Sequence, residues 1–291
     1  MTARKAVIMA VETTVTSAKA WAPDIFVFDP GDVVPDSLPL LASTVLGSIE
    51  GDEPVVRVAY VDDAEADFVA EGTEIPEADP ALDEVEIATG KVATLVHLSR
   101  ELYVQNGTAT NLATSVQRAV TTKANAVFLA QPAPASGKTT PPAGLLNVPG
   151  IVDGGAVSGS LDALADAVAT VETAGGIATT ILASPLAWSG LRKLKAGTDS
   201  NASLLGAGTQ DAERYLLGVP VIVTAAMPDA GLMIYDRSAV VSAVGQVLVA
   251  TSEHVFFTSD GIALRATWRF GQNVVRPDRV VKLTVGSTSG S

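Results

Sequence analysis

The chain contains no cysteine, only two histidines, and far fewer basic than acidic residues. Without cysteine it can form neither disulfide bonds nor thiolate metal sites, which fits a reducing cytoplasm. Its 19 Lys and Arg against 32 Asp and Glu leave a net charge of −13. Proteins that bind nucleic acid by neutralising phosphates need many Lys and Arg. The composition therefore disfavours a protein that wraps DNA or RNA.

Long apolar runs are also missing. The longest near the N-terminus is Ala6-Val-Ile-Met-Ala-Val11, which is too short for the core of a signal peptide. No run approaches the roughly 18 apolar residues that a membrane span needs. With 291 residues, 47% of them hydrophobic, the chain can bury a sizeable core in one large or two small domains.

Catalytic patterns are incomplete. A nucleophilic triad needs a positioned base, and the candidates are His97, in an apolar strand, and His254. Gly137-Lys138-Thr139 lacks the earlier glycine of a phosphate-binding loop, since Pro132 stands there. The acidic run from Asp62 to Asp67 lacks the spacing of a calcium loop and fits a solvated face better. We expect a protein that is not an enzyme and has no cofactor.

An acidic segment between two strand-like segments stands out. From Val58 to Gly90 there are eleven Asp or Glu and no Lys or Arg. The flanking segments, 55–61 and 85–96, alternate apolar and polar residues over part of their length, as half-buried strands do. Arms of about 15 residues would reach on the order of 50 Å, whereas a compact domain of this length has a radius of gyration of about 19 Å. The segment is either a hairpin that projects onto a neighbour or a meander folded back on its own domain.

The residues at this hairpin resemble a known family. Phe68-Val-Ala-Glu-Gly-Thr-Glu-Ile-Pro-Glu-Ala-Asp-Pro80, the strand that starts at Lys91, and Ser99-Arg-Glu-Leu102 resemble the major capsid proteins of tailed bacteriophages, whose fold encapsulin compartments share. Further segments agree in order and spacing: Gly144-Leu-Leu-Asn147, Ala183-Ser-Pro-Leu-Ala-Trp188, Leu191-Arg-Lys-Leu194, Leu217-Gly-Val-Pro-Val221 and Ala226-Met-Pro228. Together they span roughly Val55 to the C-terminus.

The resemblance implies an α+β fold with an N-terminal arm, an extended β-hairpin, a peripheral domain with a long spine helix, and an axial domain with a mixed sheet flanked by helices. It implies the following division of the chain: 1–51, N-terminal arm; 52–98, extended hairpin; 99–160, peripheral domain, spine helix and connection; 161–250, axial domain; 251–291, return strands of the peripheral domain and C-terminal tail.

Sequence patterns predict several elements independently of the resemblance. Apolar residues recur every four positions from Leu112 to Phe128, which predicts an amphipathic helix that starts after Thr108 or Thr110. Ser160 and Ser184-Pro185 predict two further helix starts. The second of these helices is expected to stop at Gly197, and 197–212 to form a loop. Strands are expected at 177–183, 216–224, 232–235, 262–268 and 280–285. The resemblance implies that the last two belong to the peripheral domain.

Three sets of residues are expected to serve assembly. The hairpin set, which would contact a neighbouring subunit, is Asp62, Asp63, Phe68, Glu71, Ile75, Pro76 and Glu77. The cations that could receive an acidic hairpin are Arg192, Lys193, Lys195, Arg276, Arg279 and Lys282. The residues that could face DNA are Arg118 and Lys123, although both also fit a solvent-exposed helix face.

The implied function is a structural subunit that self-assembles, as pentamers and hexamers, into the icosahedral shell around the double-stranded DNA of a tailed phage. Expected partners are other copies of the chain, portal and scaffolding proteins, a decoration protein, and DNA bound without specificity; no membrane is expected. Assembly would occur in the host bacterial cytoplasm, and the final location would be the virion. The hairpin has no lysine from Val58 to Gly90, so no isopeptide cross-link from it is expected. The alternatives are an encapsulin that encloses a cargo enzyme and an acidic α+β hydrolase or binding protein.

Overall fold

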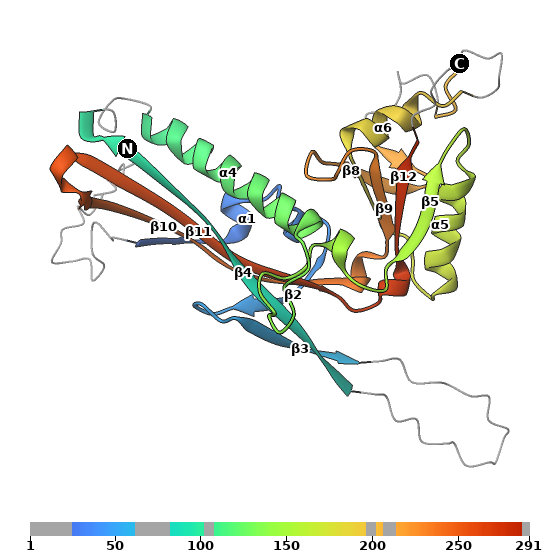
Figure 1. The fold of residues 1–291 in the computed structure, drawn as a ribbon, viewed down its shortest axis with the longest axis horizontal. Helices are drawn as coiled ribbons and strands as arrows, with labels where there is room; N and C mark the ends of the chain where they lie inside the picture. The colour runs from blue at the N-terminus through green and yellow to red at the C-terminus, as the bar shows by residue number, and fades with distance from the viewer. Residues whose placement is uncertain (1–24, 62–81, 102–107, 196–201, 206–213, 287–291) are drawn as a thin grey trace, which may run out of the picture.

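The computed structural model describes residues 25–61, 82–101, 108–195, 202–205 and 214–286. The molecule is elongated and consists of two bodies, each built on a β-sheet of six strands (Figure 1). A ribbon of two strands, β3 and β4, extends beyond the first body at an angle to it.

The first sheet has the order β1-β10-β11-β4-β3, and β2 also pairs with β10. Only the β2–β10 pair is parallel. The strands are β1 (Ile25–Phe28), β2 (Thr44–Ile49), β3 (Val55–Val61), β4 (Leu82–Ser99), β10 (Val240–Phe256) and β11 (Gly261–Val274). Short helices α1 (Pro30–Val33) and α2 (Leu38–Leu41) connect β1 to β2.

Helix α4 (Thr108–Ala130) covers one face of this sheet. The predicted stripe is confirmed, because Val116, Val120, Ala124 and Phe128 are buried in the main core and Leu112 packs against it. Opposite the helix, the sheet contributes Trp268, whose indole N–H donates to the Gly245 carbonyl at 2.9 Å. The helix therefore forms through burial of one face, as its period predicts.

The second sheet has the order β5-β12-β9-β6-β8-β7. Its strands are β5 (Val152–Val157), β6 (Thr180–Ala183), β7 (Tyr215–Leu216), β8 (Val219–Val223), β9 (Gly231–Tyr235) and β12 (Val280–Val285). Helices α5 (Asp162–Thr173) and α6 (Pro185–Arg192) pack on it. The Ser184 Oγ accepts from the Ala187 N–H at 3.0 Å, which confirms the predicted start of α6. Helix α5 begins one residue later than expected, since Leu161 is its N-cap, although the Ser160 Oγ still accepts from the Asp162 N–H at 3.4 Å.

The central strands of the second sheet join the two bodies, because both of their faces are buried. Ile181, Ala183 and Ile234 lie in the core under α5 and α6. Their neighbours Leu182 and Tyr235 point the other way, into the core shared with α4. Side chains alternate between the two faces of a strand, so one strand serves two cores.

The segment that carries α2 fastens this junction. Its Leu38 N–H donates to Asn125 Oδ1 of α4 at 2.7 Å, and its Ala42 carbonyl accepts from the Tyr235 hydroxyl of β9 at 2.6 Å. The Arg237 guanidinium donates to the Ser43 and Leu40 carbonyls, both at 2.9 Å. Burial raises the pKa of Tyr235. One short segment is thus bonded to the spine helix and to the second sheet. We refer to residues 37–43 as the junction segment.

Three expectations about the elements need correction. Strand β12 does not return to the domain of the spine helix, because it pairs with β9 and β5 of the second sheet. Strand β10 was not predicted, although it is a long strand that pairs with β1, β2 and β11 in the first sheet. Helix α6 ends at Arg192, before the expected Gly197.

Candidate assembly surfaces

The base of the β3–β4 ribbon has an apolar side that is packed onto the first body. The two strands pair from Val55↔Ala88 to Val61↔Leu82. Ile87 is fully buried with Ile49, Val241 and Ala243, and the valines of both strands pack around it. An isolated two-stranded hairpin is marginally stable in water. Here packing on β10 and β2 gives the ribbon a firm base.

A polar network locks the other side of this base. Asp52, in the turn before β3, pairs with the Lys91 Nζ of β4 at 2.9 Å and with the Arg269 Nε of β11 at 3.3 Å. The Arg269 Nη1 also donates to the Thr89 Oγ1 at 2.8 Å. The Thr89 N–H in turn donates to the Pro54 carbonyl at 2.9 Å. We call Asp52, Thr89, Lys91 and Arg269 the base lock.

The charges of the base lock are mutually compensating. The hydrogen bond from Lys91 and the nearby positive charges of Lys91 and Arg269 hold the pKa of Asp52 below its ordinary value. Lys91 is therefore already engaged within the chain. Because exposed ion pairs contribute little to stability individually, the lock mainly fixes the direction of the ribbon relative to the sheet.

Further along the ribbon, two cross-strand ion pairs of one arginine lie in solvent. Arg57 of β3 approaches Glu86 of β4 at 2.9 Å and Glu84 at 3.7 Å. The predicted hairpin residues Asp62, Asp63, Phe68, Glu71, Ile75, Pro76 and Glu77 lie outside the described residues.

The predicted cationic partners fall into two groups. Arg192 and Lys193, at the end of α6, are exposed and form no ion pair with a described residue, and Lys195 is exposed nearby. The others are half-buried. Arg279 donates to the Ala174 carbonyl at 2.9 Å, at the end of α5, and Lys282 lies 3.7 Å from Asp153. Arg279 and Lys282 therefore have roles within the chain, whereas Arg192 and Lys193 remain available.

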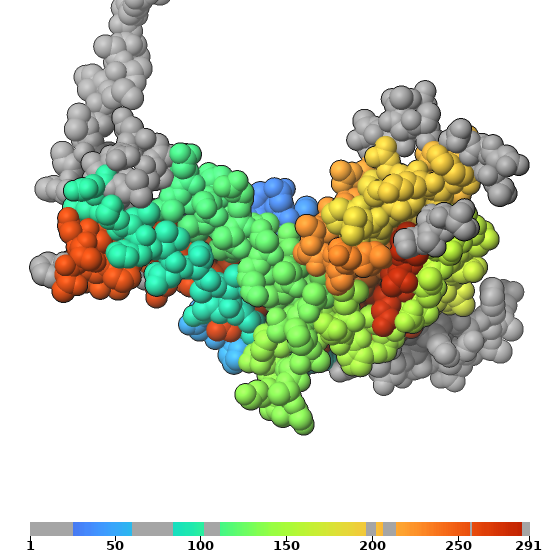
Figure 2. Space-filling view, turned by 45° about the horizontal axis from the view of Figure 1, so that its top comes forward, coloured from blue at the N-terminus to red at the C-terminus, as the bar shows by residue number. Residues whose placement is uncertain are grey.

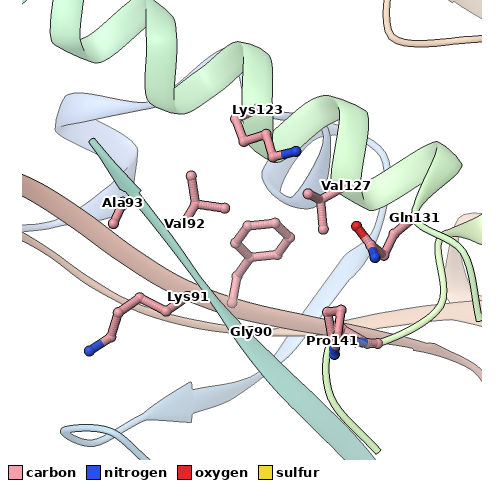
Figure 3. A pocket seen from close by; sticks show the side chains of 10 residues that line it. Gly90, Lys91, Val92, Ala93, Lys123, Val127, Gln131 and Pro141 are labelled. Atoms are coloured by element: carbon pink, nitrogen blue, oxygen red, sulfur yellow. The ribbon is translucent and has the colours of Figure 1, made fainter. Parts of the chain in front are cut away.

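Arg118 and Lys123 are both exposed on α4, which lies at the surface (Figure 2). Lys123 borders a pocket of about 390 Å³ between α4, β4 and the loop that contains Pro141. Figure 3 shows Lys123, Val127 and Gln131 of the helix above the strand that carries Val92, with the Lys91 side chain directed away from the helix. Two lysines beside an apolar floor, one of them directed away from the helix, are not the basic surface that would bind DNA tightly.

The arrangement of two bodies, a spine helix and a braced ribbon can be compared with known proteins. The phage capsid family model matches residues 39–285. The chain belongs to the phage capsid family.

Solved structures from phages and from a GTA particle agree over nearly the whole chain. The structure from Mycobacterium phage Adephagia is 17% identical, with a TM-score of 0.68 over 98% of this chain and 96% of that one. The structure from Gordonia phage Cozz is 16% identical, with a TM-score of 0.67 over 95% and 91%. The capsid of an empty GTA particle is 17% identical, with a TM-score of 0.64 over 96% and 95%. These identities establish the shared fold. Comparison with curated proteins finds no match.

Membership of the phage capsid family makes the chain a subunit of a capsid shell and favours this reading over an encapsulin. The phage capsid family is a family of structural proteins. Within the described ranges, no cluster of His, Asp and Glu could hold a metal ion. The imidazole of His97 stacks on the ring of Phe256, with centroids 3.8 Å apart, as expected for a sheet histidine. No helix of the described residues is long and apolar enough to cross a membrane.

Sequence reasoning about this capsid subunit missed the base lock. Asp52 and Arg269 are 217 positions apart, and neither belongs to a motif. The available signal was Lys91, the first cation after the acidic segment. In the folded chain, the opposite charge nearest to Lys91 is Asp52, in the turn before β3. Only the register of β3 and β4 brings these two residues together.

Proposed function

We propose that this capsid subunit is the major capsid protein of a tailed phage, and that its copies close as pentamers and hexamers into an icosahedral shell around double-stranded DNA. The observation that carries the proposal is the braced β3–β4 ribbon, which points beyond its own body (Figure 1). A projecting ribbon needs a surface to lie on, and in a shell of identical subunits that surface belongs to a neighbour.

The mechanism is geometric. Residues 1–24 of the arm and the outer part of the hairpin reach neighbouring subunits, whereas residues 25–49 belong to the first body of their own subunit. The two bodies form the wall around the five-fold and six-fold axes. The hairpin residues around Phe68 and Ile75 contact the neighbour, and Arg192 and Lys193 are the best available cations for its carboxylates. Many weak contacts in a closed symmetric shell add up to an association that is effectively irreversible.

Partners and location follow from this role. Copies of the chain assemble in the host bacterial cytoplasm with a portal, a scaffolding protein and a decoration protein, and the product is the virion head. The subunit has no catalytic activity and no cofactor. With a net charge of −13 it contacts DNA only weakly, because counterion release requires Lys and Arg.

The shell is held without covalent cross-links from the hairpin. No lysine occurs from Val58 to Gly90, and Lys91 is paired with Asp52. Boiling assembled particles in detergent is expected to give a single monomer band. A ladder of covalent oligomers would contradict this part of the proposal.

Negative-stain microscopy after size-exclusion chromatography tests the proposed function directly. Hollow shells with flat faces, or rings of five and six subunits, are expected. Small uniform shells that retain a protein cargo would favour an encapsulin instead. A monomer or dimer at all concentrations would contradict both.

A further inference from the structure

An apolar groove of about 360 Å³ separates α4 from the outer edge of the first sheet. Helix α4 provides one wall, β1 provides the other, and β10 and β11 form the floor. The principal lining residues are Phe26, Phe28, Val116, Val120, Val247 and Leu264. Side chains that belong to a core thus line an open channel, with Asp32, Gln117 and Thr251 as its polar members.

The large apolar side chains of the β1 wall are unusually exposed. Phe26 and Phe28 are 42% and 40% exposed, and their stacked rings are 6.3 Å apart. Among the described strands, β1 pairs only with β10, so its other edge is open. An open apolar edge is a site for unwanted association unless another segment covers it. An apolar segment that covers the groove would remove this exposed edge.

The described chain begins at one end of the groove. Residues 1–24 lead into β1, whose first residue, Ile25, pairs with Ala250 between the groove residues Val249 and Thr251. The part of α4 that lines the groove, Leu112 to Val120, is only about 12 Å long. The 13 residues 12–24 can span up to about 45 Å. Residues before Glu12 can therefore fold back and reach any part of the groove.

The composition of this segment fits the groove. Ala6-Val-Ile-Met-Ala-Val11 is its apolar run, and Arg4 and Lys5 precede the run in a chain that is otherwise strongly acidic. Asp32 at the rim offers these cations an opposite charge. The acidic hairpin would be repelled by the same carboxylate.

We propose that, in the unassembled subunit, residues 6–11 of the chain's own N-terminal segment fill the groove between α4 and β1. The chain's own segment is favoured over a second copy, because a short linker gives an effective concentration in the millimolar range. Bound in this way, the segment covers Phe26 and Phe28 until the subunit enters a shell. This inference goes beyond the proposed function and does not depend on it.

The absence of cysteine permits a direct test by cross-linking. In the unassembled full-length chain, Ile8→Cys is combined with Ala113→Cys, an exposed groove position on α4. Val7→Cys replaces Ile8→Cys in a parallel variant, since neighbouring side chains of an extended segment point to opposite sides. The matched control combines the same N-terminal cysteine with Ser115→Cys, an exposed residue of α4 that does not line the groove.

With about one equivalent of a short bismaleimide, at least one groove pair is expected to form an intramolecular link that joins both thiols within a monomer, whereas the Ser115 pair is expected to give mainly adducts attached through a single thiol. Equal amounts of the intramolecular link in the two pairs, or adducts attached through a single thiol in every groove pair, would overturn the proposal. A mixture of the two single-cysteine chains is expected to give no dimer, whereas cross-linked dimers would show that the occupant is a second copy. As an independent readout, deletion of residues 1–19 is expected to raise the fluorescence of bound ANS about twofold or more, since it uncovers apolar surface. Unchanged ANS fluorescence, with circular dichroism like that of the full chain, would also contradict the proposal.

Discussion

The junction between the two bodies and the base of the hairpin ribbon are built from different interactions. At the junction, most of the junction segment is buried, and the Tyr235 hydroxyl and Asn125 bond to its backbone. At the ribbon base, the apolar side is buried, but Asp52 and Lys91 of the base lock face solvent. Buried bonds are costly to break, whereas exposed ion pairs contribute little. We infer that the junction sets the stability of the subunit and that the base lock sets the direction of the ribbon.

The largest effect is expected from the core next to the junction. Phe128→Ala removes a fully buried ring from the core that both bodies share. The expected loss is about 3–5 kcal/mol of unfolding free energy, measured by urea denaturation of the unassembled subunit. Leu95→Ala is the control, because this side chain is 62% exposed. A loss no greater than that of the control would mean that the two bodies do not share a core.

A smaller loss is expected when one junction hydrogen bond is removed. Tyr235→Phe leaves the Ala42 carbonyl without the bond of 2.6 Å that it accepts. The expected cost is about 1–3 kcal/mol, by the same measurement. Tyr215→Phe, at an exposed position, should be nearly neutral. Equal effects of the two substitutions would remove the contrast between a buried junction and an exposed surface.

Removal of the base lock should affect assembly more than stability. Arg269→Ala breaks the contacts to Asp52 and Thr89. The melting temperature should fall by only about 2 °C, while the yield of shells, counted by negative stain, should fall clearly. Arg265→Ala, an exposed arginine of the same strand that forms no ion pair with a described residue, is the control. A normal shell yield for Arg269→Ala would show that the ribbon needs no fixed direction.

The smallest effect concerns pH. Because the pKa of Asp52 is lowered in the folded state, its ionised form stabilises the fold above the ordinary value of 3.8. That contribution is lost as the pH falls below 3.8 through the folded pKa. The difference in melting temperature between the wild type and Asp52→Asn should therefore be present at pH 6 and shrink below about pH 4. A difference in melting temperature that does not change with pH would mean that the charge of Asp52 does not stabilise the fold.

Local patterns predicted much of the fold. The four-residue period from Leu112 to Phe128 predicted the spine helix and its buried face, and Ser184-Pro185 predicted the start of α6. Both signals lie within a few positions of the element they define. Strand β12 was placed in the other body, because its pairing with β9 is a long-range property that its own residues do not encode. Strand β10 was missed, since Ser242, Gly245 and Ser252 interrupt its apolar pattern.

The candidate surfaces were less predictable for the same reason. The acidic character of 58–90 can be seen in the sequence, but the partners of its flanking strands cannot. Arg279 was expected to be free for a neighbour, yet it donates to the carbonyl of Ala174 at the end of α5. Which cations are available depends on the contacts of the folded chain, and a sequence pattern does not contain those contacts.

Electron cryomicroscopy of assembled particles tests the central claim most directly. The account predicts closed shells with rings of five and six subunits, in which the β3–β4 ribbon of each subunit lies on an adjacent copy. Particles in which the ribbon folds back on its own body, or a preparation that holds only monomers and dimers, would contradict it.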